Sequence, residues 1–447
     1  MHAGLVGLAL MAALSGAPEL PVVEEDVVVF KAGYAEVDIT PQASVPLWGY
    51  GVMHRPENNS TGVHDPLFAK ALVLQAGETR AALVGLDLGR APFEPMVLRI
   101  EHAVLERAGI DHVFLVGSHT HHAPALELVP VEGLNDPALD NALSYYAELE
   151  EKLVGVIVAA ANGLKPAKIG WASAESNVNR NRHTEEEPIP RDPELFVLRA
   201  DDLAGNPIAI AVNFAAHPTN HPHASNQISA DFPGVMMAAV TEATGAPCMF
   251  LQGAAGDLQC DIDDSRWGEV DLMREPGERL ARDVIALNGS LATAVPDQPD
   301  LRGVKNTFSF QMRLDLSSGP VSEGLRARYG EPLYHSYHLK YPAGMMHPKL
   351  TTLLINGELA IAGGSGEFFS DLSVDFKRRV EGAKGVFVGY CNGHDMYFPT
   401  RRAMAQGGYG ADPSTAWVTE GGPERMIDRA LWNFQKLIAE APGAPAP

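Results

Sequence analysis

Three histidines that follow a short apolar run are the first sign of chemistry in this chain. Residues 113–116 are all apolar and have the length of a buried strand, which ends at Gly117 shortly before His119, His121 and His122. In extended backbone the side chains at 119 and 121 point to the same side, because side chains alternate along a strand. Histidine is the commonest metal ligand, and open α/β sheets place their chemistry at strand ends. We therefore expect a metal site at this point of the chain.

Other polar residues also follow apolar runs, and their types suit a zinc site. Asp87, His217 and Asp257 each end such a run, and Glu367 and Tyr397 follow two more runs near the C-terminus. A catalytic zinc ion takes three or four nitrogen or oxygen ligands and keeps one position open for water. Zinc held by two imidazoles, a carboxylate and a phenolate would lower the pKa of that water to about 7 and polarise a carbonyl. These residue types are therefore typical of a zinc hydrolase.

The elements that must position these residues alternate between strands and helices. Apolar runs bounded by turns predict strands, and apolar residues at helical spacing predict helices. The predicted strands are residues 68–74, 81–87, 169–171, 195–199, 208–214, 247–251, 306–314, a hairpin over 353–361, and 386–390; the predicted helices are 95–108, 143–163, 232–244, the later part of 266–287, and 426–440. The alternation favours an α/β fold: a large single domain with mixed twisted β-sheets flanked by helices. Residues 288–350 are the least legible, and we expect a loop there that carries His335, His338 and His347.

Composition and charge limit the class of protein and of partner. The chain has 447 residues, of which 46% are hydrophobic and 20% charged, which is globular composition. Its formal net charge of −22 argues against nucleic acid or an anionic membrane as the main partner. A small-molecule or neutral lipid substrate such as an uncharged amide stays open, as does peripheral contact to a membrane. The three cysteines are too few for a disulfide framework.

The two ends of the chain differ in composition from the part between them. Residues 1–17 are apolar and typical of a secretory signal peptide, although they lack lysine and arginine. This predicts a secreted or periplasmic protein. Residues 18–30 read as a linker, residues 31–440 as the catalytic domain, and residues 441–447 as a frayed tail.

Several segments, in the same order, resemble the neutral/alkaline ceramidase family of zinc-dependent amidases over residues 31–415. The opening segment AGYAEVDITP (32–41) is similar to the start of that family's catalytic domain. SHTHHAP (118–124) resembles the family's T-H-T-H-S-G-P, FAAHPT (214–219) its F-A-x-H-P-T, and GEF (366–368) its P-G-E-F. NGHDMYFPT (392–400) resembles N-x-Y-x-x-Y-x-T-T, and the Asn179-Arg180 pair resembles I-N-R-S. Singly, Glu367 also fits an exposed turn, Tyr397 a core position and Arg180 a solvated loop, but their shared order favours the family reading.

The resemblance implies a role for each matched residue. The zinc ligands would be His119, His217, Glu367 and Tyr397. His121 would stabilise the oxyanion or shuttle a proton, Arg180 would be the active-site arginine, and Tyr409 would contact the substrate. Asp257 would orient a ligand or the water from behind.

The chain departs from the family pattern at three points. The family has G-D-V-S-P-N with a serine at the reaction centre, whereas residues 256–261 read GDLQCD and place Gln259 at the serine position. His394 replaces the first tyrosine of the family's pair and could be an extra ligand or a general acid. The similarity also stops soon before the end of the sequence, so we expect the family's C-terminal β-sandwich domain to be missing. Because zinc-activated water needs no serine, hydrolysis remains expected, whereas ceramide specificity does not follow.

The expected function is zinc-dependent hydrolysis of a linear N-acyl amide, of the kind found in sphingolipids. Three alternatives stay open on the sequence: an esterase or lactonase that uses the same site, a non-catalytic family member, and an enzyme that acts on a carbohydrate or polyol. A second, structural metal near the acidic residues Asp261, Asp263 and Asp264 is also open.

Overall fold

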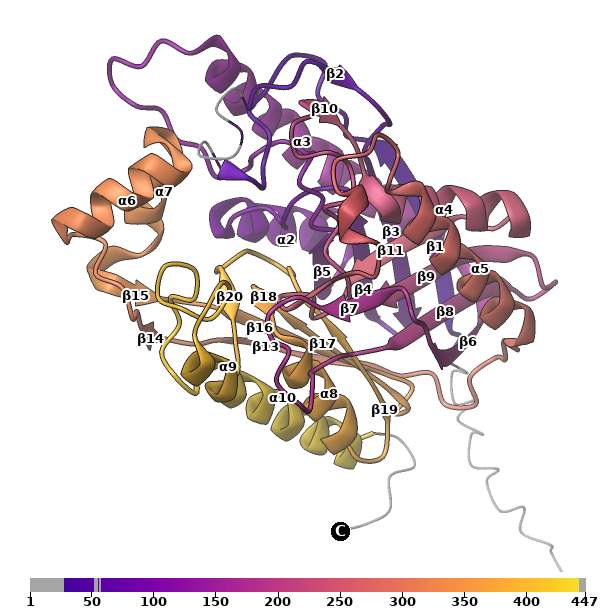
Figure 1. The fold of residues 1–447 in the computed structure, drawn as a ribbon. Coiled ribbons are helices and arrows are strands. Elements are labelled where there is room, and N and C mark those ends of the chain that lie inside the picture. The colour runs from indigo at the N-terminus through magenta and orange to yellow at the C-terminus, as the bar shows by residue number, and fades with distance from the viewer. Residues whose placement is uncertain (1–27, 52–54, 56–57, 442–447) are drawn as a thin grey trace, which may run out of the picture.

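Two β-sheets packed face to face, with helices on both outer sides, form the fold (Figure 1). The structure is a computed structural model and describes residues 28–51, 55 and 58–441. The larger sheet has eight strands and the smaller has four. The predicted architecture, mixed sheets flanked by helices, is confirmed.

The large sheet mixes parallel and antiparallel neighbours. Its strands are, in spatial order, β11 (Cys248–Gln252), β9 (Pro207–Phe214), β8 (Glu194–Asp202), β6 (Lys165–Glu175), β1 (Lys31–Asp38), β3 (Phe68–Ala76), β4 (Thr79–Leu86) and β5 (His112–Gly117). The outermost pairs, β11 with β9 and β4 with β5, are parallel, and the pairs between them are antiparallel. Most strands are apolar on both faces, because the second sheet covers one face and helices cover the other.

The small sheet lies on one face of the large one. Its strands are β13 (Leu301–Thr307), β16 (Lys349–Ile355), β17 (Leu359–Gly364) and β19 (Lys384–Val388), and β17 and β19 are parallel. Leu72 and Phe114 of the large sheet meet Leu353 and Val386 of the small sheet in one buried apolar cluster. This layer fixes the two sheets relative to each other.

Helices cover the two outer faces. α2 (Glu94–Ala108), α3 (Pro137–Asn162), α4 (Asp231–Thr244) and α5 (Arg274–Ser290) pack on the large sheet, and α8 (Ser370–Arg379) and α10 (Gly422–Ala439) pack on the small sheet. The helix predicted over 95–108 ends as expected at Gly109, whose φ of 60° allows the left-handed cap. The hairpin between β16 and β17 turns at Asn356 and Gly357, both at positive φ, as an Asn-Gly turn requires.

Four short strand pairs complete the fold near the edges of the sheets. They are β2 (Gly62–Val63) with β10 (Gln227–Ile228), β7 (Asn179–Asn181) with β12 (Leu258–Cys260), β14 (Phe310–Gln311) with β15 (Met345–Met346), and β18 (Glu367–Phe368) with β20 (Tyr397–Phe398). Short helical turns lie at η1 (Asp264–Arg266) and η2 (Pro342–Gly344), and α9 (Arg401–Gln406) follows β20.

The prediction of a histidine-bearing loop within residues 288–350 is wrong. The chain forms α6 (Gly319–Tyr329) and α7 (Glu331–Lys340) there, and His335 and His338 lie on α7. The helices escaped prediction because they are short and have little apolar periodicity: Leu325 is the sole fully buried residue of α6. The pair stands at one side of the molecule in Figure 1.

The described part of the chain also bears on its two ends. Packing begins at Phe30, the last residue of the expected linker. Phe30 is 1% exposed, and its backbone carbonyl accepts a hydrogen bond from the Ala167 amide. The signal peptide expected at 1–17 and most of the tail expected after 440 lie outside the described residues. Within residues 28–441, as far as these are described, we find no helix with the length and apolarity needed to span a membrane.

Candidate metal centre and cavity

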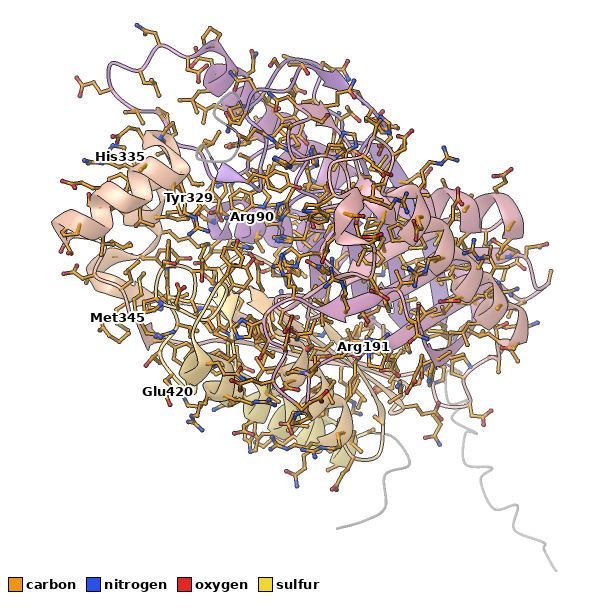
Figure 2. All side chains as sticks on the ribbon, viewed as in Figure 1. Arg90, Arg191, Tyr329, His335, Met345 and Glu420 are labelled. Carbon is orange, nitrogen blue, oxygen red and sulfur yellow. The ribbon has the colours of Figure 1, made fainter. Side chains whose placement is uncertain are left out.

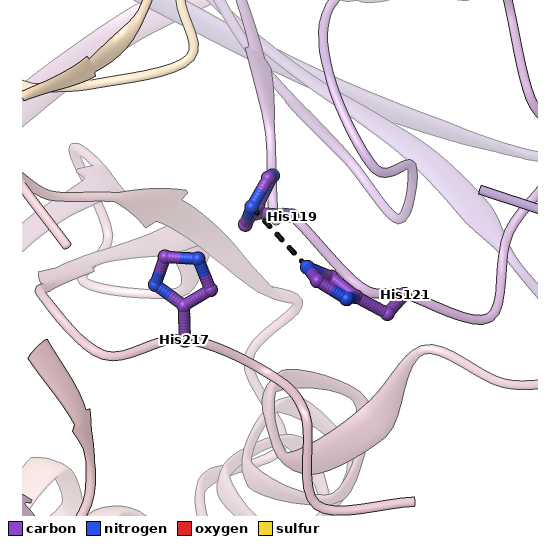
Figure 3. Close-up of side chains that lie close together, drawn as sticks. All are labelled: His119, His121 and His217. Atoms are coloured by element: carbon purple, nitrogen blue, oxygen red, sulfur yellow. Dashed lines mark hydrogen bonds between the residues drawn. The ribbon is translucent and has the colours of Figure 1, made fainter. Parts of the chain in front are cut away.

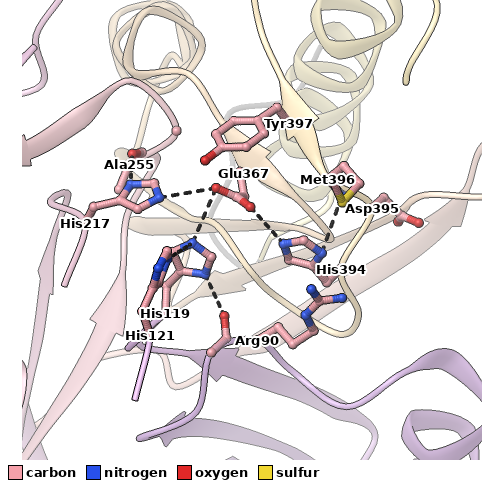
Figure 4. Close-up of polar contacts among 12 residues, drawn as sticks. Arg90, His119, His121, His217, Ala255, Glu367, His394, Asp395, Met396 and Tyr397 are labelled. Atoms are coloured by element: carbon pink, nitrogen blue, oxygen red, sulfur yellow. Dashed lines mark hydrogen bonds and ion pairs between the residues drawn. The ribbon is translucent and has the colours of Figure 1, made fainter. Parts of the chain in front are cut away.

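The predicted ligands converge where strands of both sheets end. His119 follows β5, His217 follows β9, and Glu367 follows β17 as the first residue of β18. Hydrogen bonds join these strand ends: Gln252 Nε2 donates to the Ser118 and Ala216 carbonyls, and the Gly256 amide donates to the Phe368 carbonyl. Residues separated by about a hundred positions or more in the sequence thus meet around one point (Figures 3 and 4).

The two ligand histidines turn the same ring nitrogen toward Glu367. His119 Nδ1 donates to the Gly89 carbonyl and His217 Nδ1 donates to the Ala255 carbonyl, each over 2.6 Å. In the neutral ring this leaves a lone pair on each Nε2. The two Nε2 atoms lie 3.4 Å and 3.3 Å from Glu367 Oε2. Figure 4 shows Glu367 between the two rings.

This arrangement fits a bound cation. Glu367 Oε2 is buried and has no hydrogen-bond donor, although such atoms are almost always paired. Burial by itself raises the pKa of Glu367, but His119 and the other nearby histidines hold that pKa well below its usual value. Burial and the neighbouring Arg182 lower the pKa of His217 to about 3, so this imidazole is neutral. An ionised carboxylate and neutral imidazoles are the protonation states that a metal ion needs.

His119 is held in place by an unusual backbone conformation. Its φ is 72°, in the left-handed region that residues other than glycine rarely adopt. The His119 amide donates to the Leu88 carbonyl, and the ring lies 4.2 Å from the Tyr390 ring, measured between centroids. The turn thereby directs the imidazole back toward the strand ends. Such strained positions cluster at functional sites.

Tyr397 and His394 complete the surroundings of Glu367. Tyr397 is the pairing partner of Glu367 between β20 and β18, and its hydroxyl accepts from Arg182 Nη2 over 3.0 Å. Burial, with Glu367 next, raises the pKa of Tyr397 well above its usual value. His394 Nε2 lies 3.1 Å from Glu367 Oε1, the oxygen that faces away from His217. His119, Glu367 and His394 form a second group with metal-ligand spacing, beside the group of His119, His121 and His217.

His121 and Tyr409 both line the cavity in front of the cluster. His121 Nε2 lies 3.4 Å from His119 Nε2, and its ring packs against the backbone of Gly49, where a Cβ would come within 2.4 Å of it. Tyr409 is 57% exposed, and its ring lies 5.5 Å from the Tyr397 ring. Figure 3 shows the His121 ring directed toward His119 and His217. The structure thus brings the predicted ligands, His121 and Tyr409 to one site.

The expected position of Arg180 needs correction, because its side chain points away from the cluster. Arg180 lies on β7, is partly exposed, and forms ion pairs with Asp261 and Asp264. Arg182, two residues later, reaches the site instead: its Nη2 lies 2.9 Å from His217 Nε2 and donates to the Gly256 carbonyl over 3.1 Å. The Asn-Arg pair occurs twice in a row, at 179–180 and at 181–182, and the motif alone does not say which pair faces inward.

Asp257 supports the cluster from behind rather than facing the cavity. Its carboxylate accepts from the Ser370 amide and hydroxyl over 2.6 Å and 2.8 Å, and from Asn181 Nδ2 over 3.0 Å. Burial raises its pKa to about 7. These bonds tie the segment after Glu367 to the end of β7, one residue before Arg182. Gln259, on β12, does not line the cavity.

Two further expectations find no counterpart in the cluster. Asp87 accepts from the amide of Phe68, the first residue of β3, and lies outside the site. The acidic residues 261–264 form no group with metal-ligand spacing in the described part of the chain, and Arg180 neutralises two of them.

A cavity of about 400 Å³ opens in front of the cluster. Aromatic side chains supply much of its wall, and two arginines, Arg182 and Arg328, face it. The aromatic members are Trp48, Tyr50, Trp267, Tyr329, Tyr397 and Tyr409. Figure 2 shows Tyr329, at the end of α6, on the side of the helix pair that faces the body of the molecule, and His335 on its outer side. Sequence reasoning missed Arg182, Arg328 and Trp267, because none of them follows a strand of the main sheets.

Comparison with known proteins supports one family. No protein-family model matches the chain. Over 230 residues the chain is 29% identical to neutral ceramidase A and 28% identical to neutral ceramidase B of Dictyostelium discoideum. Each match covers 46% of this chain, but only 31% and 30% of those proteins, so the chain spans less than a third of the curated relatives it matches.

The fold gives the broader match. The crystal structure of neutral ceramidase from Pseudomonas aeruginosa superimposes with a TM-score of 0.70, and the match covers 94% of this chain and 77% of that chain at 19% identity. A ceramidase complexed with C2 matches with the same score. The chain thus has the fold of a neutral ceramidase and is similar in part of its sequence to two others.

Proposed function

We propose that the chain is a zinc-dependent hydrolase that cleaves the amide bond of an N-acyl substrate. The observation that carries the proposal is Glu367 Oε2: a buried, donor-free carboxylate oxygen that faces two imidazole lone pairs in the wall of a cavity. The names of the relatives, neutral ceramidases, support an amide as the bond that is cleaved. We further propose a lipid amide as the substrate and a secreted or periplasmic location.

The metal would be held by His119, His217, Glu367 and Tyr397. When bound, zinc supplies a Lewis acid that polarises a carbonyl and lowers the pKa of water. The carbonyls of Gly89 and Ala255 fix the tautomer of the two histidines, so that each Nε2 carries a lone pair for the metal. Arg182 Nη2 lies 2.9 Å from His217 Nε2 and would turn from its lone pair when the metal binds.

Arg182 is the cation best placed to stabilise a developing oxyanion. Its Nη2 lies beside His217 Nε2 and the Tyr397 hydroxyl and also donates to the Gly256 carbonyl, which keeps its positive charge next to the site where negative charge would appear on the substrate oxygen. His121 and Tyr409 line the same cavity and can hold a proton or donate to a substrate oxygen. These roles use side chains that the structure already brings together.

Among the described residues that line the cavity, no serine or cysteine competes for the role of nucleophile. Gln259 is outside the cavity, and Cys260 is buried beside Asn220. The proposal therefore needs no covalent intermediate, and the attacking group is water.

Metal analysis joined to a substrate panel tests the proposal. We expect purified protein to contain zinc, to lose amidase activity with a chelator, and to regain it with added zinc. Matched N-lauroyl amides and O-lauroyl esters then separate an amidase from an esterase or lactonase. Full amidase activity in chelated protein without zinc would refute the metal, and turnover of the ester alone would refute the amide.

A further inference from the structure

The cavity has a charge opposite to that of the protein as a whole. The chain has a formal net charge of −22, yet the described residues that line the cavity include two arginines and a single carboxylate, Glu367. That carboxylate is turned toward the histidines and is assigned to the metal. With a divalent ion in place, the cavity is a cationic patch in a chain of negative net charge. Such a patch attracts and orients anions.

Arg328 is the arginine whose charge is not used. It lies at the end of α6, and no described carboxylate forms an ion pair with it and no described side chain or backbone group forms a hydrogen bond with it. Its guanidinium rests on two aromatic rings, 5.3 Å from the Tyr329 centroid and 5.7 Å from the Tyr409 centroid. Arg326, two residues earlier on the same helix, forms an ion pair with Glu331 at 3.4 Å.

The position of Arg328 is fixed by backbone packing. A Cβ on Gly51 would come within 2.5 Å of the Arg328 carbonyl, and Gly51 has a φ of 67°. The loop that carries Trp48 and Tyr50 therefore packs closely on the end of α6. This close approach holds the Arg328 side chain at the cavity instead of leaving it on a free helix end.

Arg182 and Arg328 occupy different depths of the same cavity. Both guanidinium carbons lie within 6 Å of the Tyr409 ring, at 5.8 Å for Arg182 and 5.7 Å for Arg328. Arg182 is already hydrogen-bonded beside the candidate metal ligands, whereas Arg328 retains its donors. When the amide of a substrate lies at the cluster, the Arg328 guanidinium is thus available to another part of the substrate. Its planar pair of N–H donors matches the oxygens of a carboxylate, sulfonate or phosphate.

We propose that the hydrolysed amide carries an anionic oxygen group close to the amide, and that Arg328 binds this group. The inference rests on the proposed hydrolase function and narrows it: the substrate is an acidic N-acyl amide, such as an N-acyl amino acid or an N-acyl aminosulfonate, and not an uncharged one. The aromatic wall around Trp267 and Tyr329 accepts the acyl chain.

Three substrates with one acyl chain test the inference: N-lauroylglycine, N-lauroyltaurine and the uncharged N-lauroylethanolamine. We expect zinc-loaded protein to have a higher kcat/KM for the carboxylate or the sulfonate than for the ethanolamide. In Arg328→Gln the ratio of anionic to neutral kcat/KM falls about ten- to hundredfold, because a charge-assisted, bidentate contact is lost. Comparison of the carboxylate with the sulfonate identifies which anion the cavity takes.

Two further variants separate charge recognition from structure. Arg326→Gln removes a charge from the same helix and keeps the ratio, and Arg328→Lys retains part of it. Thermal unfolding of each variant checks the fold. A wild type that prefers the ethanolamide, or an equal loss for all three substrates in Arg328→Gln, overturns the inference.

Measurements of substrate binding test the role of Arg328 separately from the proposed hydrolase function. If the wild type hydrolyses none of the three amides, the proposed function fails, and calorimetry with the zinc-loaded protein still tests the anion. Tighter binding of N-lauroylglycine than of N-lauroylethanolamine, lost in Arg328→Gln, supports Arg328 as the anion receptor. Equal binding of the two compounds overturns it.

Discussion

Two buried groups of histidines lie side by side in this protein, and the consecutive residues His121 and His122 belong to different groups. His121 belongs to the metal cluster, which also comprises His119, His217, Glu367 and His394. His122 belongs to a second group with His221, whose ring lies 4.6 Å from its own. In the second group Arg55 Nη2 donates to His122 Nε2 over 2.7 Å, and His221 Nε2 lies 2.9 Å from the Ser225 hydroxyl.

The difference shows that buried histidines alone do not make a metal site. In the metal cluster, Glu367 brings a negative charge, and its Oε2 lies 3.4 Å and 3.3 Å from Nε2 of His119 and His217. Each group also holds an arginine: Arg182 Nη2 lies 2.9 Å from His217 Nε2, and Arg55 Nη2 lies 2.7 Å from His122 Nε2. Burial and Arg55 hold the pKa of His122 well below its usual value, so that ring stays neutral, and no described carboxylate forms an ion pair with it. The buried carboxylate, and not the arginine, distinguishes the two groups.

Removal of a ligand from the metal cluster is the strongest test of this contrast. We expect His217→Ala to lose bound zinc and to lower kcat/KM about a thousandfold or more, because the metal supplies several kcal/mol of transition-state stabilisation. Metal analysis after gel filtration and amidase assays measure both effects. The control is His122→Asn in the second group, which keeps its zinc. Retained zinc in His217→Ala would remove the distinction between the two groups.

The two arginines of residues 180–182 provide the next test. Arg182→Ala removes the cation beside His217 and Tyr397, and we expect kcat to fall about a hundredfold, as for the loss of one preorganised donor to an oxyanion. Arg180→Ala breaks only an exposed ion pair with Asp264, so it changes kcat less than about twofold. Steady-state kinetics of the two variants with one amide decide the point. Equal losses would show that the site extends to the outer face of β7.

His394 tests how far the metal cluster depends on residues behind the ligands. Its Nε2 lies 3.1 Å from Glu367 Oε1 and can donate a hydrogen bond that orients the carboxylate. We expect His394→Ala to weaken zinc binding about ten- to hundredfold, as is typical when a partner of a metal ligand is lost. His394→Gln, which retains a donor, recovers part of the affinity. Competition with a chromophoric chelator measures both values.

A result outside that range would change the role of His394. If His394→Gln binds zinc as weakly as His394→Ala, the imidazole itself coordinates the metal. The group of His119, Glu367 and His394 would then be the ligand set, and Tyr397 would be left with its bond to Arg182.

The sequence predicted that these residues meet because they follow buried strands. His119, His217 and Glu367 each come shortly after an apolar run, and hydrogen bonds such as those from Gln252 Nε2 to the Ser118 and Ala216 carbonyls join the strand ends. The fold class was predictable for the same reason, since apolar runs mark most strands of the sheets. These predictions depended on the types of the residues that end the apolar runs, and not on any single spacing between them.

Other parts of the site depend on contacts that no local pattern records. Arg180 and Arg182 have the same neighbours in sequence, and only the end of β7 decides which one turns inward. Arg328 stands on a short helix with weak periodicity, so neither the helix nor its approach to the cavity was visible. His121 and His122 differ only in the residues that tertiary folding places beside them.

The pH dependence of stability gives the smallest and most selective test of the second group. Burial, with His64 next, lowers the pKa of His221 to about 4 from the ordinary value of 6.5. Between these two values the unfolded chain binds a proton that the folded chain does not, so this histidine makes stability fall as the pH is lowered from 6.5 to 4. Its contribution to the slope is at most about 1.4 kcal/mol per pH unit.

We expect the free energy of unfolding of His221→Asn to depend less on pH between 4 and 6.5 than that of the wild type. Above pH 7 the difference between the two should be constant. Urea unfolding of chelated wild type and variant across pH 4 to 8 measures the difference, and chelation keeps metal release out of both curves. Parallel curves would show that His221 takes up its proton equally in the folded state. The second group would then tolerate positive charge, and the contrast with the metal cluster would rest on Glu367 alone.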